Sequence, residues 1–348
     1  MMRIAIVNDT VMSVVALQKV IECNDQFSVA WIAYNGKEAV KYCAEDTPDL
    51  ILMDIVMPEM DGVEATKQIM QKSACAILIV TSTIEGNSSK VFEALGAGAL
   101  DVIHTPILTE TDDSIIGYDL CKKIRMIGSL ISYDVKTEVL QNNHTENKIL
   151  SETTTLIAIG SSTGGPTALT QVLENLPENY PAAFVITQHI DKQFINDFVK
   201  WLGEQINLPV RIACNGEKIE VGTVLVANSE ENLILTKEQT LSYTSEPKDC
   251  PYKPSVTTFF ESIAYNRLEN SIGILLTGMG KDGAAGLLAM HQKGFTTVAQ
   301  EESSCAVYGM PKAAIDLNAA DLILPPKEIN AKLMLDLSIM GQPLTKNT

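Results

Sequence analysis

Apolar and polar positions alternate in two different patterns along the first 131 residues. Short continuous apolar runs predict strands, and each is followed by a segment in which apolar positions recur every three or four residues, as in an amphipathic helix. The predicted strands lie at 3–9, 27–33, 49–54, 76–83 and 101–104, and the predicted helices at 11–22, 36–45, 63–71, 88–98 and 114–131. Uninterrupted apolar strands separated by helices are typical of a parallel sheet buried on both faces. The pattern therefore predicts an α/β domain with a doubly wound sheet over residues 1–131.

A polar stretch, 132–154, follows this domain and predicts a linker, because it is rich in Asn, Thr and Glu and has only weak apolar spacing. The alternation resumes at Thr155 and predicts a second doubly wound, Rossmann-like α/β domain over 155–348. Its main predicted strands lie at 155–161, 182–190, 209–215, 271–280, 295–300 and 321–325. Three short strands at 222–228, 232–237 and 240–245 are spaced like hairpins. We therefore expect a β-hairpin insertion in this second domain.

Charge and cysteine usage exclude several classes of protein. The 43 acidic and 26 basic residues give a formal charge of −17, which disfavours binding to nucleic acid or to anionic membrane surfaces. No apolar run reaches the roughly 18 residues of a membrane helix, and the first apolar run is too short for a signal peptide. The seven cysteines are dispersed without metal-ligand spacing, as expected for reduced thiols. We therefore expect a cytoplasmic protein that does not insert into membranes.

Polar side chains follow the strands of the first domain where each strand ends. Asn8 and Asp9 follow the first strand, Asp54 the third and Thr105 the fifth. In a doubly wound sheet, ligands bind outside the carboxyl ends of the strands. Two carboxylates at this edge suit Mg²⁺, which prefers oxygen ligands and keeps several of its waters. We therefore expect Asp9 and Asp54 to hold Mg²⁺, and Asp54 to accept a phosphoryl group.

The segment 52–62, LMDIVMPEMDG, resembles the phospho-accepting segment of the receiver domains of two-component response regulators. The resemblance covers about residues 1–130. It implies a flavodoxin-type fold, a histidine kinase as partner, Asp54 as the phosphorylation site and Asp9 as a direct metal ligand. Receivers usually have an Asp-Asp pair where this chain has Asn8-Asp9, and a lysine where it has Thr105. Two interpretations follow: phosphorylation retained at Asp54, or a receiver-shaped docking domain that is weakly or not phosphorylated.

A glycine-rich turn, GSSTG at 160–164, follows the first strand of the second domain. It fits the pattern G-x-S-x-G, in which the central serine sits on a tight strand-to-helix turn, and so indicates Ser162 as a nucleophile with Ser161 as a turn residue. A serine hydroxyl needs a base, usually a histidine, and a third group that orients the base. The alternative is a phosphate-binding turn at a helix N-terminus.

The base is found by elimination among four histidines. His104, His144 and His291 lie in the first domain, in the linker and inside a predicted helix. His189 directly follows a predicted strand, and Asp282 follows another within a glycine-rich turn. Parallel strands would bring both residues to the same sheet edge as the serine. The alternatives are a satisfied polar residue at a strand end for His189 and a helix N-cap for Asp282.

Residues 155 to about 340 resemble the catalytic domain of the chemotaxis response-regulator protein-glutamate methylesterases. The matching motifs are IGSSTGGP, VITQHI, ILLTGMGKDGAAGLLAM and TVAQEESSCAVYGMPKAAI, in this order. The resemblance implies hydrolysis of glutamate γ-methyl esters, with release of methanol, and deamidation of glutamines on the cytoplasmic part of chemoreceptors. It implies that Ser162, His189 and Asp282 form the catalytic triad and that the backbone N–H of Met279 contacts the oxyanion. N–H groups near Thr163 complete the expected oxyanion hole, and no cofactor is needed for this step.

The chain departs from the family pattern near the expected substrate region, where Trp201 replaces an arginine and Asn232 lies near the position of a histidine. Two rival functions follow from these changes. One is a non-catalytic signalling adaptor that kept the fold, and the other is a serine hydrolase of small esters.

Overall fold

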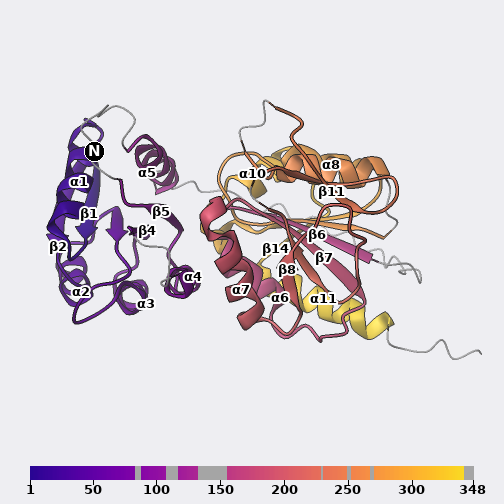
Figure 1. Cartoon of the computed structure of the whole chain (residues 1–348), viewed down its shortest axis with the longest axis horizontal. Helices are drawn as coiled ribbons and strands as arrows, with labels where there is room; N and C mark the ends of the chain where they lie inside the picture. Colours follow the sequence, from indigo (N-terminus) through magenta and orange to yellow (C-terminus); the bar gives the residue numbers. More distant parts are fainter. Residues whose placement is uncertain are drawn as a thin grey trace, which may run out of the picture. The chain divides into compact units, whose positions relative to one another are not determined.

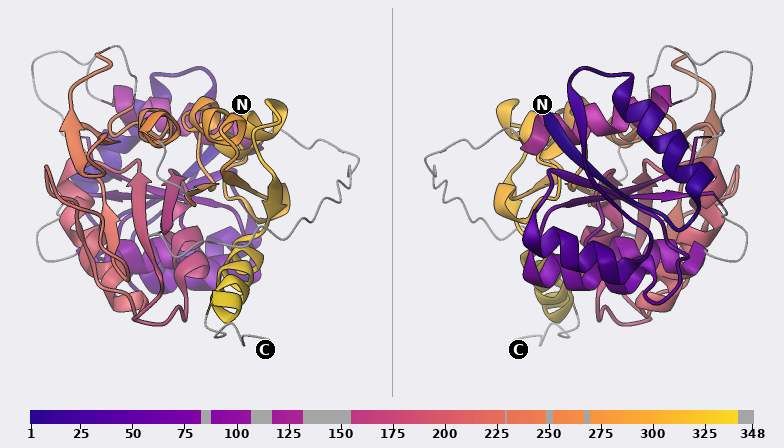
Figure 2. Two further views of the ribbon diagram at one scale, coloured as in Figure 1. Left: turned by 90° about the vertical axis from the view of Figure 1, so that its right-hand side faces the viewer. Right: turned by 90° about the vertical axis from the view of Figure 1, so that its left-hand side faces the viewer.

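The computed structural model describes residues 1–82, 88–106, 117–131, 155–228, 230–248, 252–266 and 270–340. The chain divides into two compact units, Met1–Thr137 and Glu138–Thr348. The division falls within the predicted linker, and the linker itself, 132–154, lies outside the described residues. Each unit is built around its own parallel sheet, which Figure 2 shows between two layers of helices. Within the described ranges, none of the helices has the length and apolarity that crossing a membrane requires.

The first unit contains a five-stranded parallel sheet in the order β2-β1-β3-β4-β5. Its helices α1 and α5 contact each other on one face, while α2, α3 and α4 form a row on the other (Figure 1). The element bounds are β1 Met2–Val7, α1 Val11–Glu22, β2 Phe27–Ala33, α2 Gly36–Glu45, β3 Leu50–Met53, α3 Gly62–Lys72, β4 Ala76–Thr81, α4 Ser88–Gly96, β5 Asp101–His104 and α5 Tyr118–Ile131. This strand order is that of the flavodoxin type, so the predicted fold of the first domain is confirmed.

The apolar runs of the sequence form this sheet because both faces are covered. All four side chains of β3 are buried, and β1 is buried from Ile4 to Val7. Polar residues begin two of the helices that cover the sheet: the Asn35 and Asp61 side chains accept hydrogen bonds from the first turns of α2 and α3. Side-chain acceptors of this kind satisfy N–H groups that have no partner inside the helix. The loops after the strands are thereby fixed at the carboxyl edge.

The second unit contains a seven-stranded parallel sheet in the order β14-β13-β12-β6-β7-β9-β8. Helices α8, α9 and α10 pack together on one face, and α6 contacts α7 and α11 on the other (Figure 1). The bounds are β6 Thr155–Ser161, α6 Gly165–Leu173, β7 Ala182–Gln188, α7 Ile195–Gln205, β8 Val210–Ile212, β9 Val224–Val226, α8 Val256–Asn266, β12 Ile272–Leu275, α9 Ala284–Gln292, β13 Thr296–Gln300, α10 Met310–Asp316, β14 Leu322–Leu324 and α11 Pro326–Met340. The second predicted α/β fold is confirmed as well.

Of the three short strands that were expected to form hairpins, two form a hairpin and one does not. Strands β10 (Asn232–Leu235) and β11 (Leu241–Thr244) pair antiparallel as the expected hairpin. Strand β9 instead joins the main sheet, where it pairs in parallel with both β7 and β8. The assignment of β9 to a hairpin was therefore wrong. All three of its residues are buried, and a short apolar strand of this kind is stabilised by a position inside the sheet.

The order in which the chain adds strands to the sheet reverses at one point, between β6 and β12. From β6 the chain adds β7, β8 and β9 on one side, with β9 between β7 and β8, and then returns to add β12, β13 and β14 on the other. Strands β6 and β12 are therefore neighbours whose following loops diverge to opposite sides. In open α/β sheets, ligands bind at such a switch point outside the carboxyl ends of the strands.

Candidate active site

Ser162 and His189 lie side by side at the switch point. The last residues of β6 and β7, Ser161 and Gln188, are register partners in the parallel sheet. Ser162 and His189 are the next residues of each chain segment, and the His189 N–H donates to the Ser161 carbonyl at 3.0 Å. Adjacent strands are about 4.8 Å apart, so the sheet itself sets the spacing between the two residues.

The loop after β12 closes over the same point. The Ser162 N–H donates to the Thr277 carbonyl at 3.0 Å, and Gly278 lies so close that a Cβ there would be 2.7 Å from the Ser162 Cβ. The Thr277 hydroxyl donates to the Thr163 carbonyl at 3.0 Å. The turn after β6 and the turn after β12 are thus joined by hydrogen bonds at Ser162 and Thr163.

The Gln188 side chain holds the serine turn through two hydrogen bonds. Its Oε1 accepts a bond from the Ser161 hydroxyl at 2.6 Å, and its Nε2 donates to the Ser162 carbonyl at 2.9 Å. Gly165 is required beside it, because a Cβ at that position would lie 2.1 Å from Oε1. Ser161 is fully buried and its hydroxyl is used in this bond, whereas Ser162 is only half-buried. Of the two serines, Ser162 is the one whose side chain is accessible.

His189 and Asp282 form a buried pair. The Nε2 atom of His189 lies 2.9 Å from Oδ2 of Asp282, and the two side chains are 11% and 5% exposed. Among the described residues, the other ring nitrogen, Nδ1, is buried and has no hydrogen-bond partner. A histidine held through one nitrogen and free at the other is the arrangement of a base oriented by a carboxylate.

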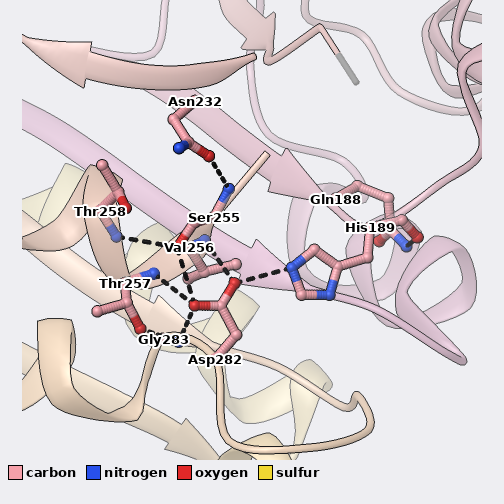
Figure 3. A network of polar contacts seen from close by, with 9 residues as sticks. All are labelled: Gln188, His189, Asn232, Ser255, Val256, Thr257, Thr258, Asp282 and Gly283. Carbon is pink, nitrogen blue, oxygen red and sulfur yellow. Dashed lines mark hydrogen bonds and ion pairs between the residues drawn. The ribbon is translucent and has the colours of Figure 1, made fainter. Parts of the chain in front are cut away.

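The Asp282 carboxylate also lies at the N-terminus of α8 (Figure 3). It accepts hydrogen bonds from the Val256 N–H at 2.8 Å, the Thr257 N–H at 3.0 Å and the Ser255 hydroxyl at 3.1 Å. The alternative in which Asp282 is the N-cap of its own helix is wrong, because α9 has Gly283 in the left-handed region at that position and no side-chain cap. Asp282 instead supplies a carboxylate to the first N–H groups of another helix, where a negative charge is stabilised.

These contacts determine the charge of Asp282. Burial by itself raises the pKa of this carboxyl group. The hydrogen bond and charge of His189, together with the bonds from Thr257, outweigh burial and lower the pKa to about 2. The carboxylate is therefore ionised at neutral pH and able to stabilise a charged imidazole.

Asn232, which the sequence singles out, and Tyr252, which has no recognisable signal in the sequence, both lie close to this pair. Asn232 is fully buried and accepts the Ser255 N–H at 2.8 Å (Figure 3). It also donates to the Glu246 carbonyl at 3.0 Å. Tyr252 stacks on the His189 ring, with centroids 4.9 Å apart and planes 7° apart. Trp201 is buried in the core, 4% exposed. Neither Trp201 nor Asn232 is therefore an exposed contact for a substrate.

The expected oxyanion donors lie on the two turns that flank Ser162. Among the described residues, the Met279 N–H has no hydrogen-bond acceptor, and Met279 follows the glycine that contacts Ser162. Thr163 precedes Gly164, which is in the left-handed region with a φ of 76° and forms the N-cap of α6. Amide groups at the start of a helix are aimed at its N-terminal end, where they stabilise negative charge.

The acidic cluster of the first unit is arranged around Asp54, which is buried at the end of β3. Its Oδ2 accepts the Asn8 amide at 2.9 Å and its Oδ1 accepts the Ile55 N–H at 2.7 Å. Burial, together with the negative charge of Asp9, raises the pKa of Asp54 to about 6, against the effect of the Ile55 hydrogen bond. Thr105 follows β5, which is separated from β3 by β4, and its hydroxyl is buried without a partner among the described residues.

The donor set of this cluster fits Mg²⁺. Within the described ranges, no group of three or more His, Cys, Asp or Glu side chains is arranged around a common metal position. Mg²⁺ is usually held by one or two carboxylates and several waters, so Asp9 and Asp54 would supply enough carboxylates without a third.

A buried His–Asp pair beside an accessible serine, at the switch point of a parallel sheet, is the arrangement expected of an α/β hydrolytic enzyme, here in one chain with a receiver-type sheet. Comparison with known families agrees with both halves. Residues 157–333 match the family model for the CheB methylesterase, and residues 4–112 match that for the response regulator receiver domain. The chain belongs to the CheB-type protein-glutamate methylesterases, which carry an N-terminal receiver domain.

Individual relatives support this assignment over almost the whole chain. A protein-glutamate methylesterase/protein-glutamine glutaminase of Bordetella avium is 47% identical over 333 residues, which is 95% of this chain and 96% of the relative. Another of Pseudomonas syringae pv. tomato is 46% identical over 96% of this chain and 98% of the relative. The crystal structure of the Thermotoga maritima CheB methylesterase catalytic domain is 33% identical and aligns with a TM-score of 0.51 over 53% of this chain and 98% of that domain.

Proposed function

We propose that this chain hydrolyses glutamate γ-methyl esters, and deamidates glutamines, on the cytoplasmic part of methylated chemoreceptors. Ser162 is the nucleophile, His189 the base and Asp282 the group that orients the base. The observation that carries the proposal is the buried His189–Asp282 pair, held at 2.9 Å beside Ser162. The names of the relatives, which are protein-glutamate methylesterases and protein-glutamine glutaminases, supply the substrate class. The enzyme works in the cytoplasm, where the receptor's signalling part lies.

The two ring nitrogens of His189 have different roles in the proposed reaction. Nε2 is bound to Asp282, so Nδ1 is the atom that takes the proton of Ser162 as its Oγ attacks the ester carbonyl. The N–H groups of Met279 and Thr163 stabilise the oxyanion, and loss of one such donor typically costs about 10²- to 10³-fold in rate. His189 then protonates the departing methoxide, or the departing amide nitrogen when the substrate is a glutamine. Water hydrolyses the acyl-enzyme and restores Ser162.

The assignment of the nucleophile is tested by methanol release from methylated receptor with the full chain. Ser162→Ala should lower the rate by at least about 10³-fold, because the covalent route is removed. Ser161→Ala is the matched control: it loses one buried hydrogen bond to Gln188, which costs about 1 kcal/mol, but it keeps the attacking hydroxyl. Methanol release by Ser162→Ala at the wild-type rate would refute the assignment.

The same assay separates the rival functions. A wild-type chain that releases methanol from neither methylated receptor nor a small methyl ester would be an adaptor. A chain that cleaves only the small ester would be a hydrolase of another class.

The receiver domain is proposed to regulate this reaction through Asp54. A histidine kinase of the chemotaxis type supplies the phosphoryl group, and Mg²⁺ held by Asp9 and Asp54 would neutralise the charge of the incoming phosphoryl oxygens. The support lies in the buried Asp54 carboxylate at the strand edge, close to Asp9. Asn8 donates to Asp54 Oδ2 and therefore orients the acceptor from a position at which receivers usually have an acid.

A further inference from the structure

Tyr252 lies face to face with the histidine of the proposed triad. The ring centroids of Tyr252 and His189 are 4.9 Å apart, and the ring planes are nearly parallel, at 7°. Tyr252 comes from the segment directly before α8, three residues ahead of Ser255, whose hydroxyl donates to Asp282. The tyrosine therefore approaches His189 from the same segment that holds the orienting carboxylate.

The hydroxyl end of Tyr252 reaches the turn that carries Met279. A Cβ placed on Gly280 would lie 2.7 Å from the Tyr252 hydroxyl oxygen. Gly280 is in the left-handed region, with a φ of 84°, and its lack of a side chain admits the tyrosine. One side chain thus contacts both the ring of the proposed base and the turn of a proposed oxyanion donor.

The stack has an electrostatic consequence for the reaction. The face of an aromatic ring carries negative partial charge, and it attracts a cation within about 6 Å of its centroid. The His189 ring is neutral before it takes the serine proton and positively charged afterwards. Tyr252 therefore stabilises the charged form that arises during the reaction more than the neutral form, and only such a difference accelerates the chemical step.

We infer that Tyr252 is a positioning residue of the methylesterase site, which fixes the plane of the His189 ring by stacking and stabilises the imidazolium in the transition state. The inference rests on the triad proposed above. The aromatic ring carries the effect, whereas the hydroxyl mainly locates the ring against Gly280.

Steady-state methanol release from methylated receptor tests the effect on the reaction. With the full chain, Tyr252→Leu should lower kcat about tenfold, the size of a partly desolvated cation–π interaction, and leave KM within about twofold. Tyr252→Phe keeps the ring and should remain within about twofold of the wild-type kcat. Tyr252→Gln is a second non-aromatic replacement and should resemble Tyr252→Leu. Tyr265→Leu is the matched control, because Tyr265 is 75% exposed at the far end of α8.

The stack itself is tested by NMR of chains labelled at the histidine rings. The four histidines give four signals for the ring proton between the two nitrogens, and His189→Gln identifies the one that belongs to His189. That signal should lie upfield in the wild type and in Tyr252→Phe, because it is above an aromatic ring. It should move downfield in Tyr252→Leu and Tyr252→Gln, and not in Tyr265→Leu. The signals of the other three histidines report whether each variant is folded.

The outcomes distinguish this inference from the proposed function. A wild-type chain without methanol release overturns the function. An active wild type overturns the inference about Tyr252 if Tyr252→Leu has the same kcat, if Tyr252→Phe is as slow as Tyr252→Leu, or if the His189 signal does not move when the tyrosine ring is removed.

Discussion

The Asp282 carboxylate has two tasks at once. It accepts one hydrogen bond from His189 and four from the residues that begin α8 and α9, namely Ser255, Val256, Thr257 and Gly283. A carboxylate with several N–H donors is held in one orientation and keeps its charge although it is buried. The same contacts that stabilise the start of α8 thereby fix the direction in which His189 points.

The depressed pKa of Asp282 predicts how stability depends on pH. The folded pKa is about 2, below the value of about 3.9 in an unfolded chain. The charged form therefore contributes about 2 kcal/mol to the free energy of unfolding above pH 4, and this contribution is lost as the pH falls toward 2. In urea unfolding of the full chain, the gap between wild type and Asp282→Ala should be constant from pH 7 to 5 and narrow below pH 4.

Asp316 provides the control for this measurement. It pairs with Lys312 on the surface of α10, and the two side chains are 63% and 56% exposed. Its replacement by alanine should produce a small gap that does not change over this pH range, because exposed pairs contribute little. A gap for Asp282→Ala that widens as the pH falls would contradict the prediction.

At the scale of elements, the turn between β6 and α6 depends on glycines that admit neighbouring side chains. Gly160 lies against Val256, where a Cβ would be 2.2 Å from a methyl carbon, and Gly165 lies against Gln188. The turn is therefore packed from two directions, by the start of α8 and by the end of β7. This close packing restricts the serine turn, although it contains three glycines between 160 and 165.

Gly165→Ala should disrupt the site through Gln188. The new Cβ would lie 2.1 Å from Oε1 of Gln188, so Gln188 must move and release Ser161 and the Ser162 carbonyl. Overpacking of this kind costs about 1–3 kcal/mol. Methanol release should fall, and the denaturant midpoint should fall with it.

Gly203→Ala is the matched control within the same domain. Gly203 is exposed in the last turn of α7, where a Cβ would meet only ordinary contacts at 3.7 and 3.8 Å. Alanine should leave activity unchanged and raise stability slightly, by about 0.5 kcal/mol, because it is the better helix former. Equal behaviour of the two variants would show that the Gly165 contact does not matter.

The sequence predicts the residues of the proposed triad because the local hydrophobic pattern locates each of them. Ser162, His189 and Asp282 follow apolar strands, and the end of a buried strand is visible in the hydrophobic pattern. The donors of α8 were not predictable, because the Val256 N–H reaches Asp282 across 26 positions of the chain and no local signal marks the contact. Tyr252 was missed for the same reason, and β9 was misassigned because its three residues look alike in a hairpin and in a sheet.

At the scale of the whole molecule, the chain combines two independently packed α/β units, each with its candidate site at the carboxyl edge of its own sheet. Separate apolar cores surround β1 to β5 and β6 to β14. Regulation of the second unit by the first then requires a modification of the first unit that changes the free-energy difference between the inactive and active states of the chain. In the first unit, the candidate for that modification is Asp54.

The residue at position 105 should set the strength of this regulation. Phosphorylation of Asp54 adds negative charge at the same sheet edge as Thr105, which is 9% exposed and has no positive charge to offer. A complete switch from 1:99 to 99:1 requires about 5.5 kcal/mol of differential stabilisation, and a charge-assisted contact from a lysine is the strong kind of hydrogen bond that contributes to it. With threonine, we expect the full chain to respond to a small-molecule phosphodonor and Mg²⁺ with only a partial rise in methanol release. Thr105→Lys should enlarge the rise, Thr105→Val should leave it near the wild-type level, and Asp54→Ala should abolish it while basal release persists.

Intact mass spectrometry reports whether each variant carries the phosphoryl group. A variant that is phosphorylated but shows no rise in methanol release has lost the coupling between the units, whereas a variant without the added mass was not phosphorylated. An equal response of Thr105→Lys and Thr105→Val would show that a cation at this position does not strengthen the switch.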